Sequence, residues 1–86
     1  MWYVYILRCR DNTFYTGVTN DPVRRLGMHN AGTGAKYTRS RLPVEMVYLE
    51  STESHPQALK REYTIKQLTR QEKISLIQSA NAPLPR

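Results

Sequence analysis

Cysteine is nearly absent from this sequence, since Cys9 is the single one among 86 residues. One cysteine excludes a disulfide framework, and no Cys or His spacing typical of a metal site occurs. No apolar run approaches the roughly 20 residues that a membrane-spanning helix needs, and no signal-peptide pattern opens the chain. We therefore expect a soluble protein of the reducing cytoplasm.

Length is the second shortage. A chain of 86 residues buries only roughly 60–65% of its unfolded surface, which supports one small core. We expect one domain over residues 1–80 and a frayed tail over residues 81–86. A shallow surface site fits such a domain better than a deep ligand cavity.

Acidic residues are missing from the stretch between Pro22 and Val44, in a chain of net charge +6. Clustered positive charge is the electrostatic signature of a phosphate-backbone partner. A solvated basic face with no partner is the alternative that charge alone leaves open. The cations of this stretch are Arg24, Arg25, Lys36, Arg39 and Arg41.

Residues 2–20 predict a β-hairpin. Aromatic and β-branched residues dominate segments 2–7 and 14–19, and Arg10-Asp11-Asn12 supplies the turn. The first segment is apolar on both faces, which is typical of a central strand.

The pairing of these two strands decides which side chains share a face. We expect Tyr5, Tyr15 and Gly17 to face one site, which requires paired residue numbers with an even sum. Tyr5 would then lie opposite Gly17 and Cys9 opposite Thr13, with a loop of odd length. Gly17 would leave open space above the Tyr5 ring for a phosphate.

A helix is predicted from Pro22 to about Asn30, because Asp21 can cap it and proline suits its first position. Val23 and Leu26 would form its core stripe. Arg25 and His29 are four residues apart, so we expect them side by side near the sheet.

Residues 33–43 predict a loop. Its cations and hydroxyls suit backbone phosphates, and its aromatic ring suits a stacked base. An ordinary basic surface loop is equally consistent with these residues. The candidate nucleic-acid contacts are Arg24, Lys36, Tyr37, Arg39 and Arg41.

Two further helices are predicted after a strand at residues 44–51. Ser54 and Pro56 begin the first, which runs to about Leu68. Thr69 and Glu72 fit a capping box that begins a short third helix.

Glu62 is the least expected residue of the second helix. A helical projection places it within an apolar stripe of Ala58, Leu59, Tyr63 and Ile65. A carboxylate facing a core costs several kcal/mol unless it is paired. A buried salt bridge, for example to Arg25, and a metal ligand are both open interpretations.

Taken together, these residues resemble the GIY-YIG nuclease superfamily, in particular its small single-domain bacterial members. The resemblance rests on Tyr3-Val4-Tyr5, on Tyr15-Thr16-Gly17 ten residues later, and on Arg25, His29 and the late Glu62. It departs at Tyr3, Thr16 and Val18, and no late asparagine stands at a convincing place. The resemblance implies an α+β fold, with a three-stranded antiparallel sheet and about three helices.

The resemblance also implies catalytic roles for Tyr5, Tyr15, Arg25, His29 and Glu62. Glu62 would hold one Mg²⁺ or Mn²⁺ ion, and a single carboxylate suffices because water and phosphate complete the shell. Arg25 would bind the scissile phosphate, while the tyrosines and His29 would handle the attacking water. A tyrosine is a poor base unless its pKa is lowered, which a metal, Arg25 and protonated His29 could do.

The function expected from these residues is a metal-dependent endonuclease for DNA, with RNA not excluded. One small domain has too little surface to read a long sequence. We therefore expect branched, flapped or damaged DNA as substrate, a place in DNA repair, and specificity from a partner protein. The alternatives are a non-cleaving nucleic-acid-binding module that uses the basic surface of residues 24–41, and a basic interaction protein.

Overall fold

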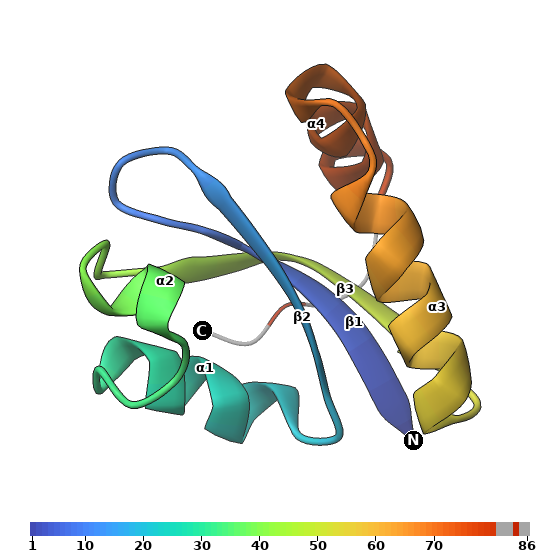
Figure 1. The fold of residues 1–86 in the computed structure, drawn as a ribbon, viewed down its shortest axis with the longest axis horizontal. Coiled ribbons are helices and arrows are strands. Elements are labelled where there is room, and N and C mark those ends of the chain that lie inside the picture. The colour runs from blue at the N-terminus through green and yellow to red at the C-terminus, as the bar shows by residue number, and fades with distance from the viewer. Residues whose placement is uncertain (81–83, 85–86) are drawn as a thin grey trace.

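The computed structural model describes residues 1–80 and Leu84. The expected tail at 81–86 lies, apart from Leu84, outside the described residues. The elements follow one another as β1 (Trp2–Arg8), β2 (Phe14–Thr19), α1 (Pro22–Asn30), α2 (Lys36–Arg39), β3 (Glu45–Thr52), α3 (His55–Lys66) and α4 (Arg70–Ser79) (Figure 1).

The strands form one antiparallel sheet in the order β2-β1-β3. The expected three-stranded sheet with a central first strand is therefore confirmed. Among the described residues four helices flank it rather than three, because the segment predicted as a loop contains the short helix α2.

The predicted hairpin register is also confirmed. Tyr5 pairs with Gly17 and Leu7 pairs with Tyr15, while the Cys9 N–H donates to the Thr13 carbonyl over 2.8 Å. The odd-length loop is closed by Asn12, whose φ of 65° lies in the left-handed region that asparagine tolerates.

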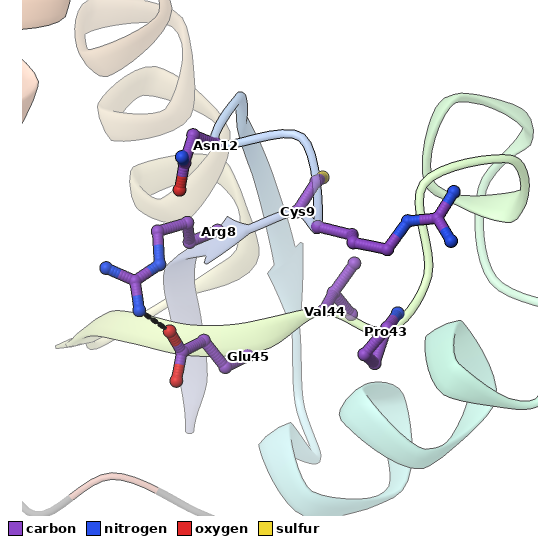
Figure 2. A pocket seen from close by; sticks show the side chains of 7 residues that line it. Arg8, Cys9, Asn12, Pro43, Val44 and Glu45 are labelled. Carbon is purple, nitrogen blue, oxygen red and sulfur yellow. Dashed lines mark hydrogen bonds and ion pairs between the residues drawn. The ribbon is translucent and has the colours of Figure 1, made fainter.

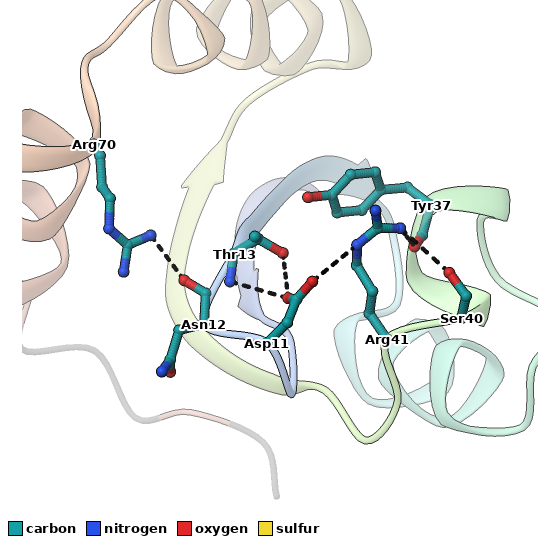
Figure 3. Close-up of polar contacts among 7 residues, drawn as sticks. All are labelled: Asp11, Asn12, Thr13, Tyr37, Ser40, Arg41 and Arg70. Carbon is teal, nitrogen blue, oxygen red and sulfur yellow. Dashed lines mark hydrogen bonds and ion pairs between the residues drawn. The ribbon is translucent and has the colours of Figure 1, made fainter.

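Two arginines hold this hairpin loop from either side (Figure 3). Arg41 Nε lies 3.1 Å from Asp11 Oδ2, and Arg70 donates to the Asn12 carbonyl over 2.7 Å. Segments far apart in the sequence thereby fix the position of the loop.

The helices begin as the sequence predicts. The Asp21 side chain accepts from the Arg24 N–H, the Ser54 side chain accepts from Gln57, and Thr69 forms a capping box with Glu72. These caps satisfy N–H groups that have no partner inside a helix.

Each face of the sheet has its own core. Tyr5 and Leu7 of β1 pack with Leu26 and Met46 on the side of α1. The alternate residues of β1 pack against the helices on the other side (Figure 1), in a cluster of Val4, Ile6, Tyr48, Ala58 and Ile65.

The prediction of a core position is wrong for three residues, which are exposed in the structure. Val23 and Tyr63 are each 68% exposed and Leu59 is 44% exposed. In α3 only Ala58 and Ile65 are fully buried, seven residues apart, so its core stripe is narrow and excludes Leu59 and Tyr63. In α1 the buried residues are Leu26 and His29, and Val23 does not lie on their side of the helix. None of the described helices is long and apolar enough to cross a membrane.

Candidate active site

The Tyr5 hydroxyl is the centre of a buried polar cluster on the α1 side of the sheet. Tyr5 is 1% exposed and His29 is fully buried. Tyr5 Oη lies 2.9 Å from His29 Nε2, and Arg25 Nε donates to it over 3.4 Å. The structure thus brings together the three predicted site residues that β1 and α1 supply.

Thr38 is the hydrogen-bond partner of His29 Nδ1. His29 Nδ1 lies 2.8 Å from Thr38 Oγ1, and the Thr38 hydroxyl donates its only proton to the Ala35 carbonyl over 3.1 Å. This hydrogen bond to Ala35 favours the tautomer in which Thr38 accepts from His29 Nδ1–H. In the neutral ring Nε2 is then the acceptor, so the Tyr5 hydroxyl donates to it.

Burial sets the charge state of this cluster. Burial, aided by the nearby charge of Arg25, lowers the pKa of His29 from 6.5 to about 4. Burial also raises the pKa of Tyr5, outweighing the hydrogen bond from Arg25. The expectation that a protonated His29 lowers the tyrosine pKa is therefore wrong, because a buried imidazole remains neutral near pH 7.

Two glycines allow the chain to pack directly on these rings. A Cβ at Gly17 would lie 2.5 Å from Tyr5 Oη, and one at Gly34 would lie 2.4 Å from His29 Nδ1. The open space predicted beside Gly17 is therefore filled by the Tyr5 ring itself, so that prediction is wrong. Gly34 and Thr38 were missed by sequence reasoning, since nothing local marks them among the small and hydroxyl residues of their segment.

Tyr15 connects this cluster to α2. Its ring centroid lies 6.4 Å from that of Tyr5 and 5.3 Å from that of His29. Tyr37 stacks on Tyr15 with a centroid separation of 6.2 Å. Tyr15 is half-buried, so it forms part of the boundary between the buried cluster and solvent.

Glu62 approaches the cluster from α3. Its carboxylate pairs with Lys66, with Oε2 3.3 Å from Nζ, and its side chain is 20% exposed. The suggested salt bridge to Arg25 is thus replaced by a pair within the helix. The Glu62 charge contributes to the raised pKa of Tyr5, which places the carboxylate within electrostatic reach of the hydroxyl.

The neighbouring Arg61 holds α3 in position. Its Nε lies 3.1 and 3.0 Å from the two carboxylate oxygens of Glu50 on β3. Adjacent residues on a helix point about 100° apart. The Arg61 pair therefore fixes the direction in which Glu62 projects.

The basic surface divides into two kinds of cation. Arg24, Lys36 and Arg39 are exposed and form no ion pair with another described residue. Arg41 instead binds Asp11, donates to the Tyr37 carbonyl over 2.7 Å, and lies 3.9 Å from the Tyr37 ring centroid. The structure gives Arg41 a structural task, and its phosphate contact stays a prediction.

Comparison with known proteins identifies the family of this chain. The sequence matches the GIY-YIG catalytic domain over residues 1–75. The chain belongs to the GIY-YIG family. The predicted resemblance is thereby confirmed, and the family is a nuclease superfamily whose substrates are nucleic acids.

Relatives of similar size support this assignment. The chain is 54% identical to a UPF0213 protein of Clostridium perfringens, over 92% of this chain and 85% of that protein. It is 53% identical to one from Halobacterium salinarum, over 88% of this chain and 99% of the relative. The NMR structure of a UPF0213 protein from Bacillus halodurans is 43% identical and superposes with a TM-score of 0.61, covering 96% and 89% of the two chains.

GIY-YIG nucleases generally use divalent metal ions, and the sequence predicts Glu62 as the carboxylate that would hold one. The described residues contain no group of three or more His, Cys, Asp or Glu side chains able to hold a metal. Mg²⁺ is commonly held by one or two carboxylates, with water and phosphate oxygens completing its shell. A metal at Glu62 would compete with the Lys66 ammonium for the same carboxylate.

A cleft on another part of this GIY-YIG domain lacks the combination of residues found around Tyr5. It has a volume of about 320 Å³ and lies beneath the hairpin loop (Figure 2). Its Arg8 and Glu45 side chains pair with each other, and burial raises the pKa of the Cys9 thiol. A thiol with a raised pKa is a poor nucleophile, so Cys9 gives this cleft no activated nucleophile.

Proposed function

We propose that this chain is a divalent-metal-dependent endonuclease that hydrolyses phosphodiester bonds in DNA with low intrinsic sequence specificity. The observation that carries the proposal is the continuous hydrogen-bond chain Arg25–Tyr5–His29–Thr38, and the charge of Glu62 acts on the Tyr5 hydroxyl within it. The small domain supports recognition of branched, flapped or damaged DNA rather than of a long sequence. A partner protein would supply any further specificity.

In the proposed reaction Tyr5 and His29 act in series. As the attacking water gives a proton to Tyr5 Oη, the tyrosine passes its own proton to the free lone pair of His29 Nε2. His29 becomes an imidazolium whose Nδ1–H remains bonded to Thr38. A neutral His29 is required for this step, and its pKa of about 4 keeps it neutral at pH 7.

Arg25 would bind the scissile phosphate. Its hydrogen bond to Tyr5, at 3.4 Å, is long, and the other N–H donors of its planar group suit two phosphate oxygens. As Arg25 turns toward a phosphate, it would uncover the Tyr5 hydroxyl for the attacking water. A bound divalent ion would stabilise the charge that develops on the departing 3′ oxygen.

The test replaces Glu62 by glutamine and measures cleavage of plasmid and branched DNA with Mg²⁺ or Mn²⁺, against chelator. We expect at least about a 10²-fold loss of rate, because a metal-supplied charge is worth several kcal/mol. Glu53→Gln is the matched control, since Glu53 is an exposed glutamate. Cleavage by Glu62→Gln at the rate of Glu53→Gln would contradict the proposal.

One observation favours a second candidate function. Tyr5 and His29 are only 1% and 0% exposed, as in a structural polar network, which suits a module that binds nucleic acid through residues 24–41 without cutting it. Such a module would bind DNA or RNA with strong salt dependence and cleave neither with any divalent metal. The cleavage assay therefore separates the two functions.

A further inference from the structure

A small cleft lies at the free edge of the sheet, next to the buried polar cluster of Tyr5, His29 and Arg25. Its volume is about 200 Å³. Because β2 is an edge strand, elements from both sides of the sheet meet here, and two lysines from beyond the basic stretch of residues 24–41 contribute. The lining residues are Phe14, Tyr15, Thr16, Tyr37, Lys66 and Lys73.

Aromatic rings and cations occur together in this cleft. The rings of Tyr15 and Tyr37 are 24° from parallel, and Arg41 covers one face of the Tyr37 ring. Tyr37 is nevertheless 38% exposed, so the part of the residue that Arg41 and Tyr15 leave uncovered is available to a ligand. Aromatic rings beside lysines are the chemistry with which proteins bind unpaired nucleotides, because bases stack and phosphates attract cations. The volume is below the roughly 300–1,000 Å³ of pockets for drug-sized ligands, which favours a single base.

The cleft is also placed correctly relative to the reaction. Tyr15 lines it and approaches His29 with a ring separation of 5.3 Å. Lys66 lines it and also pairs with Glu62 at 3.3 Å. The cleft is therefore separated from the candidate general base and from the candidate metal ligand by one side chain each.

We propose that this cleft binds one unpaired nucleotide of the substrate strand, adjacent to the scissile phosphate. The base packs against the part of the Tyr37 ring that Arg41 and Tyr15 leave uncovered, and Lys66 and Lys73 bind the flanking phosphates. The position next to the scissile bond rests on the proposed function, whereas binding of an unpaired nucleotide does not. The subsite makes an unpaired arm, as in a flap, the feature of DNA that this domain recognises.

The test measures binding by fluorescence anisotropy in chelator, where metal-dependent cleavage does not occur. Labelled duplexes with and without a single-stranded flap are titrated with the protein. Tyr37→Leu should weaken flap binding at least fivefold, the low end for loss of one base–aromatic stack. Tyr63→Leu is its matched control, because Tyr63 is an exposed tyrosine outside the cleft.

The cation is tested separately at Lys73, because Lys66 also pairs with Glu62. Lys73→Gln should weaken flap binding and lower the salt dependence by about 0.7 in slope, the value for one phosphate of a single strand. Lys60→Gln is the control, since Lys60 is an exposed lysine of α3 that does not line the cleft.

Abasic nucleotides identify the bound base with the wild-type protein. They are placed one at a time along the flap. At one position near the junction, the abasic nucleotide should weaken flap binding by the wild type as much as Tyr37→Leu weakens binding of the intact flap. The same abasic nucleotide should not weaken flap binding by Tyr37→Leu any further, because both changes remove the same stacking contact. The abasic experiment and Lys73→Gln test the subsite even if thermal melting shows that Tyr37→Leu is unfolded.

The outcomes distinguish this subsite from the nuclease function. Flap binding that is equal in the cleft variants and their controls, or insensitive to every abasic position, overturns the subsite even where the wild type cuts flaps with Mg²⁺ or Mn²⁺. Absence of any preference for flapped over blunt duplex also overturns it. Subsite-dependent binding without cleavage supports the subsite and contradicts only the nuclease proposal.

Discussion

The two faces of the sheet bury different chemistry from a single strand. Toward α1, β1 presents Tyr5 to the fully buried His29, which in turn bonds the fully buried Thr38. Toward α3, β1 presents Val4 and Ile6 to an apolar cluster. Alternation along one strand therefore gives one face a buried polar network beside its core and the other an apolar cluster.

The polar face is stable because its hydrogen bonds are complete. No buried side-chain nitrogen or oxygen within the described part of the chain lacks a partner. An unpaired buried donor or acceptor would cost about 1–3 kcal/mol. We therefore expect substitutions on the α1 face to change the reaction more than the fold, and substitutions on the α3 face to do the reverse.

Tyr5→Phe should have the largest effect and act mainly on the reaction. It removes the hydroxyl that contacts both Arg25 and His29, so cleavage should fall by about 10²–10⁴-fold, the usual contribution of general acid–base catalysis. Stability should fall by only about 1–3 kcal/mol, because His29 Nε2 loses its donor. Single-turnover cleavage and urea unfolding measure the two effects.

The control for this change is Tyr3→Phe, which alters a half-buried tyrosine of the same strand. It should cut DNA within about twofold of the wild type. Equal rates for the two phenylalanine variants would show that the Tyr5 hydroxyl takes no part in the reaction.

Ile65→Ala should have the opposite profile. Ile65 is fully buried on the α3 face, and truncation of a core isoleucine costs about 2–5 kcal/mol. Urea unfolding should show this loss, while the cleavage rate of the folded fraction at low temperature stays near the wild-type value. Leu59→Ala on the same helix, at a side chain that is 44% exposed, should cost far less.

If Ile65→Ala lowered the cleavage rate as strongly as its stability, the two faces would be coupled rather than separate. The Arg61–Glu50 pair that holds α3 would then be the connection to examine, because it lies beside Glu62.

The features that the sequence predicted correctly depend on neighbours along the chain. The hairpin register followed from requiring Tyr5 and Gly17 on one face, and the helix starts followed from capping side chains such as Asp21. Thr38 could not be assigned in this way, because its role arises only when α2 folds against His29.

Electrostatics was predicted less well than topology. Glu62 was recognised as unusual, but its partner is Lys66 on its own helix rather than Arg25. The pKa directions of Tyr5 and His29 depend on burial, which residue types alone do not determine. The proximity of Tyr5, Arg25 and His29 was thus predictable from the sequence, while the protonation states of Tyr5 and His29 required the packing.

Acid should destabilise the polar face through His29. Its pKa is about 4 in the folded chain and 6.5 as the reference value, so the folded state favours the neutral ring. The contribution of neutral His29 to the free energy of unfolding is therefore fully present above about pH 6.5. It is lost as the pH falls toward 4, and the loss has an upper bound of about 3 kcal/mol.

The measurement compares urea unfolding across this pH range for the wild type, His29→Gln and His55→Gln. His29→Gln should show a smaller fall in the free energy of unfolding between pH 6.5 and 4 than the wild type. Removing His55, which is exposed and stacks on Trp2, should leave that loss unchanged. Parallel curves for the wild type and His29→Gln would show that His29 is not held neutral by burial.

Thr38→Val should have the smallest of these effects and reveals whether His29 is merely packed or is oriented for proton transfer. Valine keeps the shape but removes the acceptor of Nδ1–H, so the imidazole can place its proton on Nε2 and no longer accept from Tyr5. We expect about a tenfold slower cleavage, whereas Thr38→Ser, which retains the hydroxyl, should stay near the wild-type rate. Nitrogen chemical shifts of His29 should report the change of tautomer in Thr38→Val alone. A purely structural threonine would lower stability in Thr38→Val but leave both the tautomer and the pH profile of cleavage unchanged, so the tautomer measurement decides whether the buried face is built for chemistry.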